Sequence, residues 1–121
     1  MTWEFKDDRP IYTQIAEQIK LRIVSGLYAA GARLPSVRDL AAEASVNPNT
    51  MQRALTDLER EGILYSERTS GRFVSEDGEM IRRTREGLAV EVVDAFLLRM
   101  GKLGYDCESA CELVRGREGK Q

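Results

Sequence analysis

The chain of 121 residues contains no histidine, and its only two cysteines are Cys107 and Cys111. It therefore lacks the most common metal ligand and the usual general base at neutral pH. Two thiols do not make a structural zinc site, and in a chain with no signal segment we expect them to be reduced. There is also no glycine loop that could cradle a phosphate, and no isolated acid pair with a reason to be buried. We expect no metal, no cofactor and no enzymatic activity.

Long hydrophobic runs and an excess of positive charge are also missing. No apolar run approaches the roughly 18 residues that a membrane span requires, which predicts a soluble, cytoplasmic protein with no membrane partner. The chain has 18 Lys and Arg against 20 Asp and Glu, although many DNA-binding proteins carry a positive excess. The position of charge matters more than its sum. Five arginines fall in or around one segment, which predicts a local basic face: Arg33, Arg38, Arg53, Arg68 and Arg72.

That segment, from Pro35 to Gly62, predicts two short helices joined by a tight turn. Ser36 can cap the first helix, with Asp39 completing a capping box. Asn47 can cap the second helix, and proline at position 48 suits its first turn. One face of the second helix is apolar, and its opposite face is suited to reading base edges. That polar face carries Asn49, Gln52, Arg53, Thr56 and Arg60.

The flanking segments extend this unit. Residues 1–9 predict an extended arm, whose aromatic residues either cover the edge of the core or pack on a second subunit. A helix is expected from Pro10 to about Ser25, and residues 32–34 could form a short strand. After Gly62, strands at 63–68 and 72–75 are expected around a loop at 69–71. A hairpin in this place makes a winged helix-turn-helix domain over residues 1–76, mainly α with a small β wing (α+β), with the wing at 69–72.

Residues 77–121 predict a helix from about Met80 to Lys102 and then a shorter one that carries Cys107, Ala110, Cys111 and Val114 on one stripe. An amphipathic pair this small needs another apolar surface, which is either the first domain or a second copy of the chain, and we favour the second copy. The expected dimerisation residues are Leu88, Val92, Val93, Phe96, Leu97, Met100, Leu103, Cys107, Cys111 and Val114. For the two cysteines we favour the role of small buried hydrophobic residues over that of a redox switch, because a bridge within an intact helix has poor geometry.

Several spaced elements carry a family resemblance: residues 31–41 (GARLPSVRDLA), residues 46–50 (VNPNT), Ala54-Leu55 and residues 58–62 (LEREG). Over residues 10–76 the chain resembles the DNA-binding domain of the GntR family of bacterial transcription regulators. The short two-helix C-terminal region resembles the YtrA subfamily. The resemblance implies a homodimer that binds an inverted-repeat operator, usually as a repressor. A small-molecule effector stays open, as does the alternative of a winged-helix protein-interaction module.

The resemblance also implies roles for individual residues. Arg38 would contact a phosphate or a base at the edge of the major groove, and Ser36 would contact a phosphate. The start of the recognition helix at 48–61 would hold the DNA backbone, and Gln52 and Arg53 would reach bases. The complete expected DNA-binding set is Arg33, Ser36, Arg38, Asn47, Asn49, Thr50, Gln52, Arg53, Thr69, Ser70, Gly71 and Arg72. The chain departs from the family where Thr69-Ser70 replaces the usual Gly-Lys pair and where Ser45 replaces a glycine of the turn.

Overall fold

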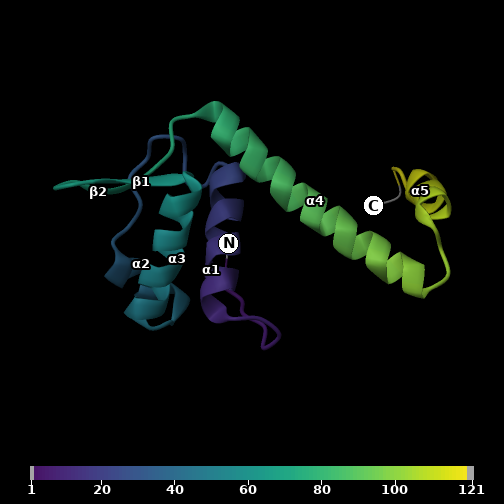
Figure 1. The fold of residues 1–121 in the computed structure, drawn as a ribbon, viewed down its shortest axis with the longest axis horizontal. Helices are drawn as coiled ribbons and strands as arrows, with labels where there is room; N and C mark the ends of the chain where they lie inside the picture. Colours follow the sequence, from purple (N-terminus) through teal and green to yellow (C-terminus); the bar gives the residue numbers. More distant parts are fainter. Residues whose placement is uncertain (1, 120–121) are drawn as a thin grey trace. The chain divides into compact units, whose positions relative to one another are not determined.

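The computed structural model describes residues 2–119, which form five helices and one two-stranded antiparallel sheet (Figure 1). The elements in chain order are α1 (Ile11–Val24), α2 (Val37–Ala44), α3 (Pro48–Glu61), β1 (Leu64–Glu67), β2 (Gly71–Val74), α4 (Gly78–Lys102) and α5 (Cys107–Gly116). The expected class, mainly α with a small β wing, is confirmed. The chain divides into two compact units, Met1–Arg85 and Glu86–Gln121, called here the N-terminal and C-terminal units.

The core of the N-terminal unit lies where helices α1, α2 and α3 pack together with the hairpin. Ile15 and Ile19 of α1 are fully buried, as are Met51 and Leu58 of α3. These residues recur at helical spacing, so each helix presents one continuous apolar face to the others. The first turns of α4 add Met80 and Ile81 to the same core. The unit therefore extends beyond the wing and includes the start of α4.

The hairpin pairs β1 with β2 in a register that runs from Leu64 opposite Val74 to Glu67 opposite Gly71. The second strand begins at Gly71, one residue earlier than expected, and Gly71 has φ +108°. The short strand expected at 32–34 exists as an isolated bridge between Arg33 and Phe73. Its backbone bonds join Leu34 N to Arg72 O and Val74 N to Ala32 O, both at 2.9 Å. The hairpin is thereby anchored to the segment that leads into α2.

The N-terminal arm folds back on its own unit. Trp3 and Phe5 are partly buried against the core, and the guanidinium carbon of the buried Arg22 lies 3.8 Å from the centre of the Trp3 ring. Of the two interpretations of the arm, the structure supports aromatic residues that cover the edge of the core.

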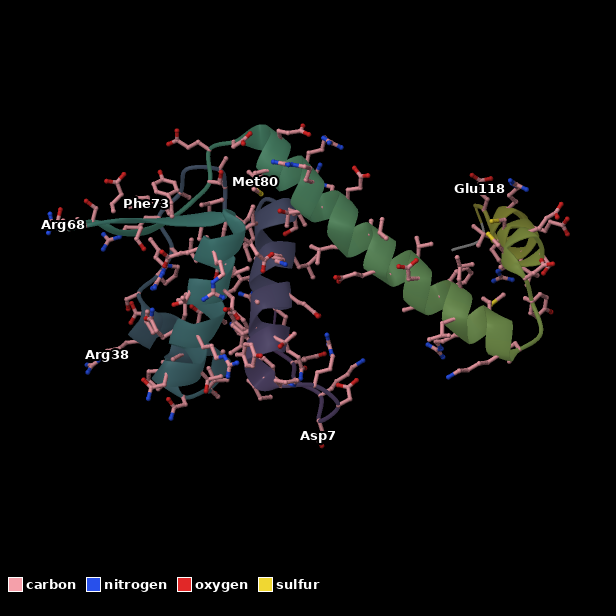
Figure 2. All side chains as sticks on the ribbon, in the orientation of Figure 1. Asp7, Arg38, Arg68, Phe73, Met80 and Glu118 are labelled. Atoms are coloured by element: carbon pink, nitrogen blue, oxygen red, sulfur yellow. The ribbon has the colours of Figure 1, made fainter. Side chains whose placement is uncertain are left out.

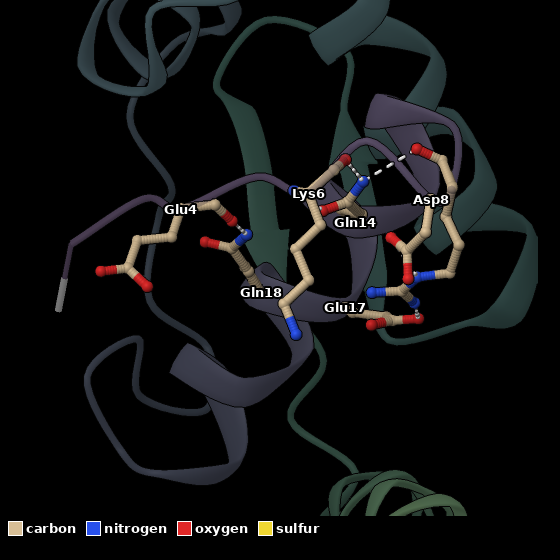
Figure 3. Close-up of polar contacts among 7 residues, drawn as sticks. Glu4, Lys6, Asp8, Gln14, Glu17 and Gln18 are labelled. Atoms are coloured by element: carbon tan, nitrogen blue, oxygen red, sulfur yellow. Dashed lines mark hydrogen bonds and ion pairs between the residues drawn. The ribbon is translucent and has the colours of Figure 1, made fainter. Parts of the chain in front are cut away.

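Polar contacts hold the arm to α1 (Figure 3). The Gln14 amide donates to the carbonyl oxygens of Lys6 at 2.7 Å and Arg9 at 2.8 Å. Its own oxygen accepts from the Lys6 N–H at 2.8 Å. Gln18 donates to the Glu4 carbonyl at 2.6 Å, and Arg9 forms an ion pair with Glu17. Gln14 is buried, so these bonds satisfy its polar atoms away from water.

The C-terminal unit is built differently, because α4 contributes no buried residue and α5 buries only Ala110. Large apolar side chains stay exposed, among them Val92 at 70% and Leu103 at 72%. Both cysteines are also exposed. The expectation that Cys107 and Cys111 are buried is therefore wrong for the single chain, since two helices cannot enclose their own apolar faces. None of the helices described is long and apolar enough to cross a membrane.

Candidate DNA-binding surface

Helices α2 and α3 and the turn between them form a helix-turn-helix with the expected caps. Ser36 Oγ accepts from the Asp39 N–H at 3.1 Å, and Asn47 Oδ1 accepts from the Asn49 N–H at 2.7 Å. Pro48 occupies the first turn of α3. Both predicted N-caps are confirmed, but the predicted capping box is incomplete, because the Asp39 side chain forms no bond back to the Ser36 N–H. The turn requires a left-handed residue, and Ser45 adopts φ +56° there, which glycine would do with less strain.

The contacts of two glutamates show which way the sides of α3 face. On one side, Glu59 accepts from Ser66 Oγ at 2.9 Å and pairs with Arg72, both on the hairpin. On the other side, Glu61 pairs with Lys20 of α1 at 2.7 Å. The exposed strip of α3 therefore lies between the hairpin and α1. The positions of Gln52 and Thr56 on the helix place them on the hairpin side, because residues three and four apart share a face.

The exposed strip begins at the N-terminus of α3. Asn47 and Asn49 are exposed there and Thr50 is half-buried. Free N–H groups and the helix dipole favour an anion at such an end. Further along, the Gln52 amide donates to Thr56 Oγ1 at 3.2 Å. This bond fixes the orientation of the amide and leaves its oxygen available to a base.

The arginines between residues 30 and 76 fall into two groups. Arg72 and Arg60 are neutralised by Glu59 and Asp57, the latter at 2.9 Å. A second group forms no ion pair with any residue in 2–119, and it consists of Arg33, Arg38, Arg53 and Arg68. All four of these arginines are exposed. Figure 2 shows Arg38 projecting from α2 and Arg68 at the tip of the hairpin.

A groove of about 470 Å³ runs between the hairpin and the segment before α2. Arg33 and Ser36 line one side, and Arg68 and Thr69 line the other. Gly71 suits this position because side chains are rarely compatible with its φ of +108°, and a Cβ would in addition lie 3.0 Å from Arg33 Nε. The groove thus combines the guanidinium groups of Arg33 and Arg68 with the hydroxyl groups of Ser36, Ser66 and Thr69, which are donors that a phosphate can accept from. The Glu67 carboxylate also lies in its lining.

The structure brings together only some of the expected DNA-binding residues. Arg33, Ser36, Thr69, Gly71 and Arg72 line the groove, although the Arg72 side chain is occupied by Glu59. Ser70 is exposed in the loop beside them. Arg53 turns toward α1, with its guanidinium carbon 3.7 Å from the centre of the Tyr12 ring. Sequence reasoning left Arg68 out of the expected set, although a cation next to the position of the usual wing lysine was a signal for it.

The C-terminal unit carries an apolar groove of about 500 Å³. Seven of the ten expected dimerisation residues line it: Val92, Val93, Phe96, Leu97, Cys107, Cys111 and Val114. Met100 and Leu103 line a neighbouring groove, and Leu88 is half-buried. Sequence reasoning missed Leu113, which is 44% exposed. A hydrogen bond with Cys111 raises the pKa of the Cys107 thiol, and this lowers its thiolate fraction and its reactivity toward oxidants.

The fold and the surface define a winged helix-turn-helix transcription regulator. The family model for bacterial regulatory proteins of the gntR family matches residues 11–74, so the chain belongs to the GntR family. It is 38% identical over 112 residues to the uncharacterized HTH-type transcriptional regulator YhcF of Bacillus subtilis, covering 93% of each chain. It is 42% identical over 74 residues to the repressor YtrA of the same organism, covering 61% of this chain and 57% of YtrA. These relatives are transcription regulators, not enzymes, and the resemblance to YtrA-type members is confirmed.

Solved structures agree with this assignment. A GntR family regulator from Listeria monocytogenes superposes with a TM-score of 0.84 at 39% identity, covering 93% of this chain and 98% of that one. The DNA-binding domain of AraR, solved in complex with operator ORX1, superposes with a TM-score of 0.56 at 28% identity, covering 62% of this chain and 99% of that one.

Proposed function

We propose that this regulator is a cytoplasmic homodimeric repressor that binds an inverted-repeat DNA operator. Helix α3 would enter the major groove, and the hairpin loop would lie along the backbone beside it. The observation that carries this proposal is the separation of charge on the N-terminal unit. Glu59 and Asp57 are neutralised by neighbouring arginines, whereas Arg33, Arg38 and Arg68 remain uncompensated near the groove and the start of α2. A protein with a net charge of −2 thereby presents a local cationic face.

The groove between the hairpin and the segment before α2 would hold the phosphate backbone. Arg33 and Arg68 supply cations from its two sides, and Ser36 and Thr69 supply hydroxyl donors. Phosphate contacts of this kind fix the position of a protein on the duplex without specifying sequence. Arg68 would also provide the cation that Thr69-Ser70 lacks at the wing.

Sequence choice would come from the exposed strip of α3. Gln52 has an amide oriented by Thr56, and glutamine can pair with adenine through two hydrogen bonds. Arginine pairs in the same way with guanine, which makes Arg53 the second candidate reader. The AraR domain in complex with an operator supports this docking, because its fold matches the N-terminal part of the chain.

The C-terminal unit would join two copies. No residue described between 86 and 119 covers its apolar groove, and symmetric pairing of two identical faces is the most common solution for such a surface. Two recognition helices related by a two-fold axis would read two half-sites, so the proposed operator is an inverted repeat. The name of YtrA as a repressor supports the same direction of regulation.

The proposal is tested with a duplex that the wild-type chain selects from a random-sequence pool. We expect Arg38→Ala to weaken binding about tenfold and to reduce the salt dependence by about one counterion. Gln52→Ala is expected to relax base preference at one position of each half-site. Arg82→Ala is the matched control, because Arg82 forms an ion pair with Glu79 at 2.6 Å. Equal affinity of the wild type for selected and scrambled duplexes would overturn the proposal.

A further inference from the structure

Tyr12 and Arg53 come from different helices and meet at the edge of the reading surface. Tyr12 lies in the first turn of α1, half-buried and packed against the core. The Arg53 guanidinium carbon lies 3.7 Å from the centre of the Tyr12 ring, which is a stacking distance for a cation over an aromatic face. We propose that Tyr12 is a positioning residue that orients Arg53 for base reading. This inference rests on the proposed function, because it assigns a determinant of specificity to the same DNA-binding surface.

The ring of Tyr12 is a fixed platform because the start of α1 is held from several directions. Pro10 precedes the helix as its N-cap residue. Gln14, one half-turn beyond Tyr12, bonds the arm through the Lys6 and Arg9 carbonyls (Figure 3). The body of α1 packs on α3 through the buried Ile15 and Ile19. The position of the ring relative to α3 is therefore set by the core and by the arm together.

Arg53 keeps its charge available for DNA. The carboxylate one turn further along α3 belongs to Asp57, and this carboxylate pairs with Arg60 at 2.9 Å. Arg53 itself forms no ion pair with any residue in 2–119. The ring thus restrains the guanidinium without neutralising it, whereas a carboxylate would do both.

Stacking also leaves the hydrogen-bond donors of the guanidinium in place. These donors lie in the plane of the group, so a ring on one face does not block them. An arginine restrained in this way loses less conformational freedom when it pairs with a base, which improves both affinity and discrimination. The arm, the start of α1, Tyr12 and Arg53 form a continuous set of contacts that ends at the base-reading side chain.

The test measures binding to the wild-type-selected duplex and to a panel with each base pair changed in turn. A contact of this type at an exposed site predicts that Tyr12→Ala weakens binding about two- to five-fold. The loss of discrimination should fall at the base pairs that Arg53→Ala affects. Tyr12→Phe keeps the aromatic face and should restore wild-type discrimination. In an Arg53→Ala background, Tyr12→Ala should have no further effect.

Tyr28→Ala is the matched control, since Tyr28 also packs partly buried on the core but the cation–π contacts within residues 2–119 involve Trp3 and Tyr12. Its loss should lower stability without changing base preference. Wild-type discrimination in Tyr12→Ala would overturn the inference, as would an equal loss in the Arg53→Ala background or in Tyr28→Ala. If the wild-type chain itself shows no base preference, the proposed function is contradicted, and not only this inference.

Discussion

The N-terminal unit buries its large apolar side chains, whereas the C-terminal unit leaves many of them exposed. Helix α1 buries Ile15, Ile19 and Ile23 together with the polar Gln14 and Arg22, whereas the 25 residues of α4 contribute no buried residue. The N-terminal unit therefore buries its apolar side chains in a core of its own. The second unit exposes apolar side chains to water, which costs about 25 cal/mol for each Å² left uncovered. This difference indicates that the N-terminal unit folds on its own core, and it supports the proposal that a second copy covers the apolar face of the C-terminal unit.

The difference between the units is tested most sharply by truncating one leucine to alanine in each unit. Leu58 in α3 is fully buried, and Leu98 in α4 is 65% exposed. We expect Leu58→Ala to lower the free energy of unfolding by about 2–5 kcal/mol, because it leaves a cavity in a packed core. Leu98→Ala should change it by less than about 0.5 kcal/mol. Denaturant unfolding measures both, and equal losses would show that the two units do not differ in this way.

A charge placed in the apolar groove tests the second half of the comparison. Phe96 lines three neighbouring grooves of the C-terminal unit. We expect Phe96→Glu to halve the mass measured by light scattering and to weaken operator binding about a hundredfold, because two linked half-sites become independent. Trp3, the single tryptophan of the chain, lies in the N-terminal unit, and its fluorescence should report unchanged unfolding there. A wild-type chain with the mass of one copy would contradict the proposal.

Loss of the contact between Glu59 of α3 and the hairpin should lower the free energy of unfolding by less than loss of Leu58 does. The Glu59 carboxylate accepts hydrogen bonds from Ser66 Oγ and from the Arg72 guanidinium, both on the hairpin. Glu59→Gln removes the negative charge from this partly buried contact and should cost about 1–2 kcal/mol of unfolding free energy. Glu43→Gln is the matched control on the exposed side of α2, with an expected change within about 0.5 kcal/mol. If both variants unfold alike, the contact does not brace the hairpin.

The smallest expected effect concerns the turn of the helix-turn-helix. Ser45 has φ +56°, so Ser45→Gly should relieve strain and raise the free energy of unfolding by about 0.5 kcal/mol. Ser25, at the end of α1, has φ −81°. The same substitution there relieves no strain and should destabilise. Thermal unfolding of the two variants compares the signs, and a loss of stability in Ser45→Gly would contradict the argument.

Local signals in the sequence predicted much of the fold. The caps at Ser36 and Asn47, the turn at Ser45 and the three-residue hairpin loop depend on residues close together in the chain, so their patterns are readable. The contacts of Tyr12 with Arg53 and of Glu59 with Arg72 join residues 41 and 13 positions apart. No periodicity signals such contacts, and for this reason the orientation of the two arginines could not be predicted.

The error at Cys107 and Cys111 has a related cause. Their spacing correctly placed them on one face of α5, but spacing does not say whether another element covers that face. In the single chain they are exposed. A partner surface is a property of the assembly, and the pattern of one amphipathic helix does not contain it.

The most direct test of the whole account is a hydroxyl-radical footprint of the wild-type chain on the duplex that it selects. Two copies joined through the C-terminal unit, each reading through α3 and the hairpin, predict two protected regions related by a two-fold axis. Their centres should be separated by about one helical turn of DNA, or a multiple of it. A single protected region without symmetry, or no protection above a scrambled duplex, would contradict the account.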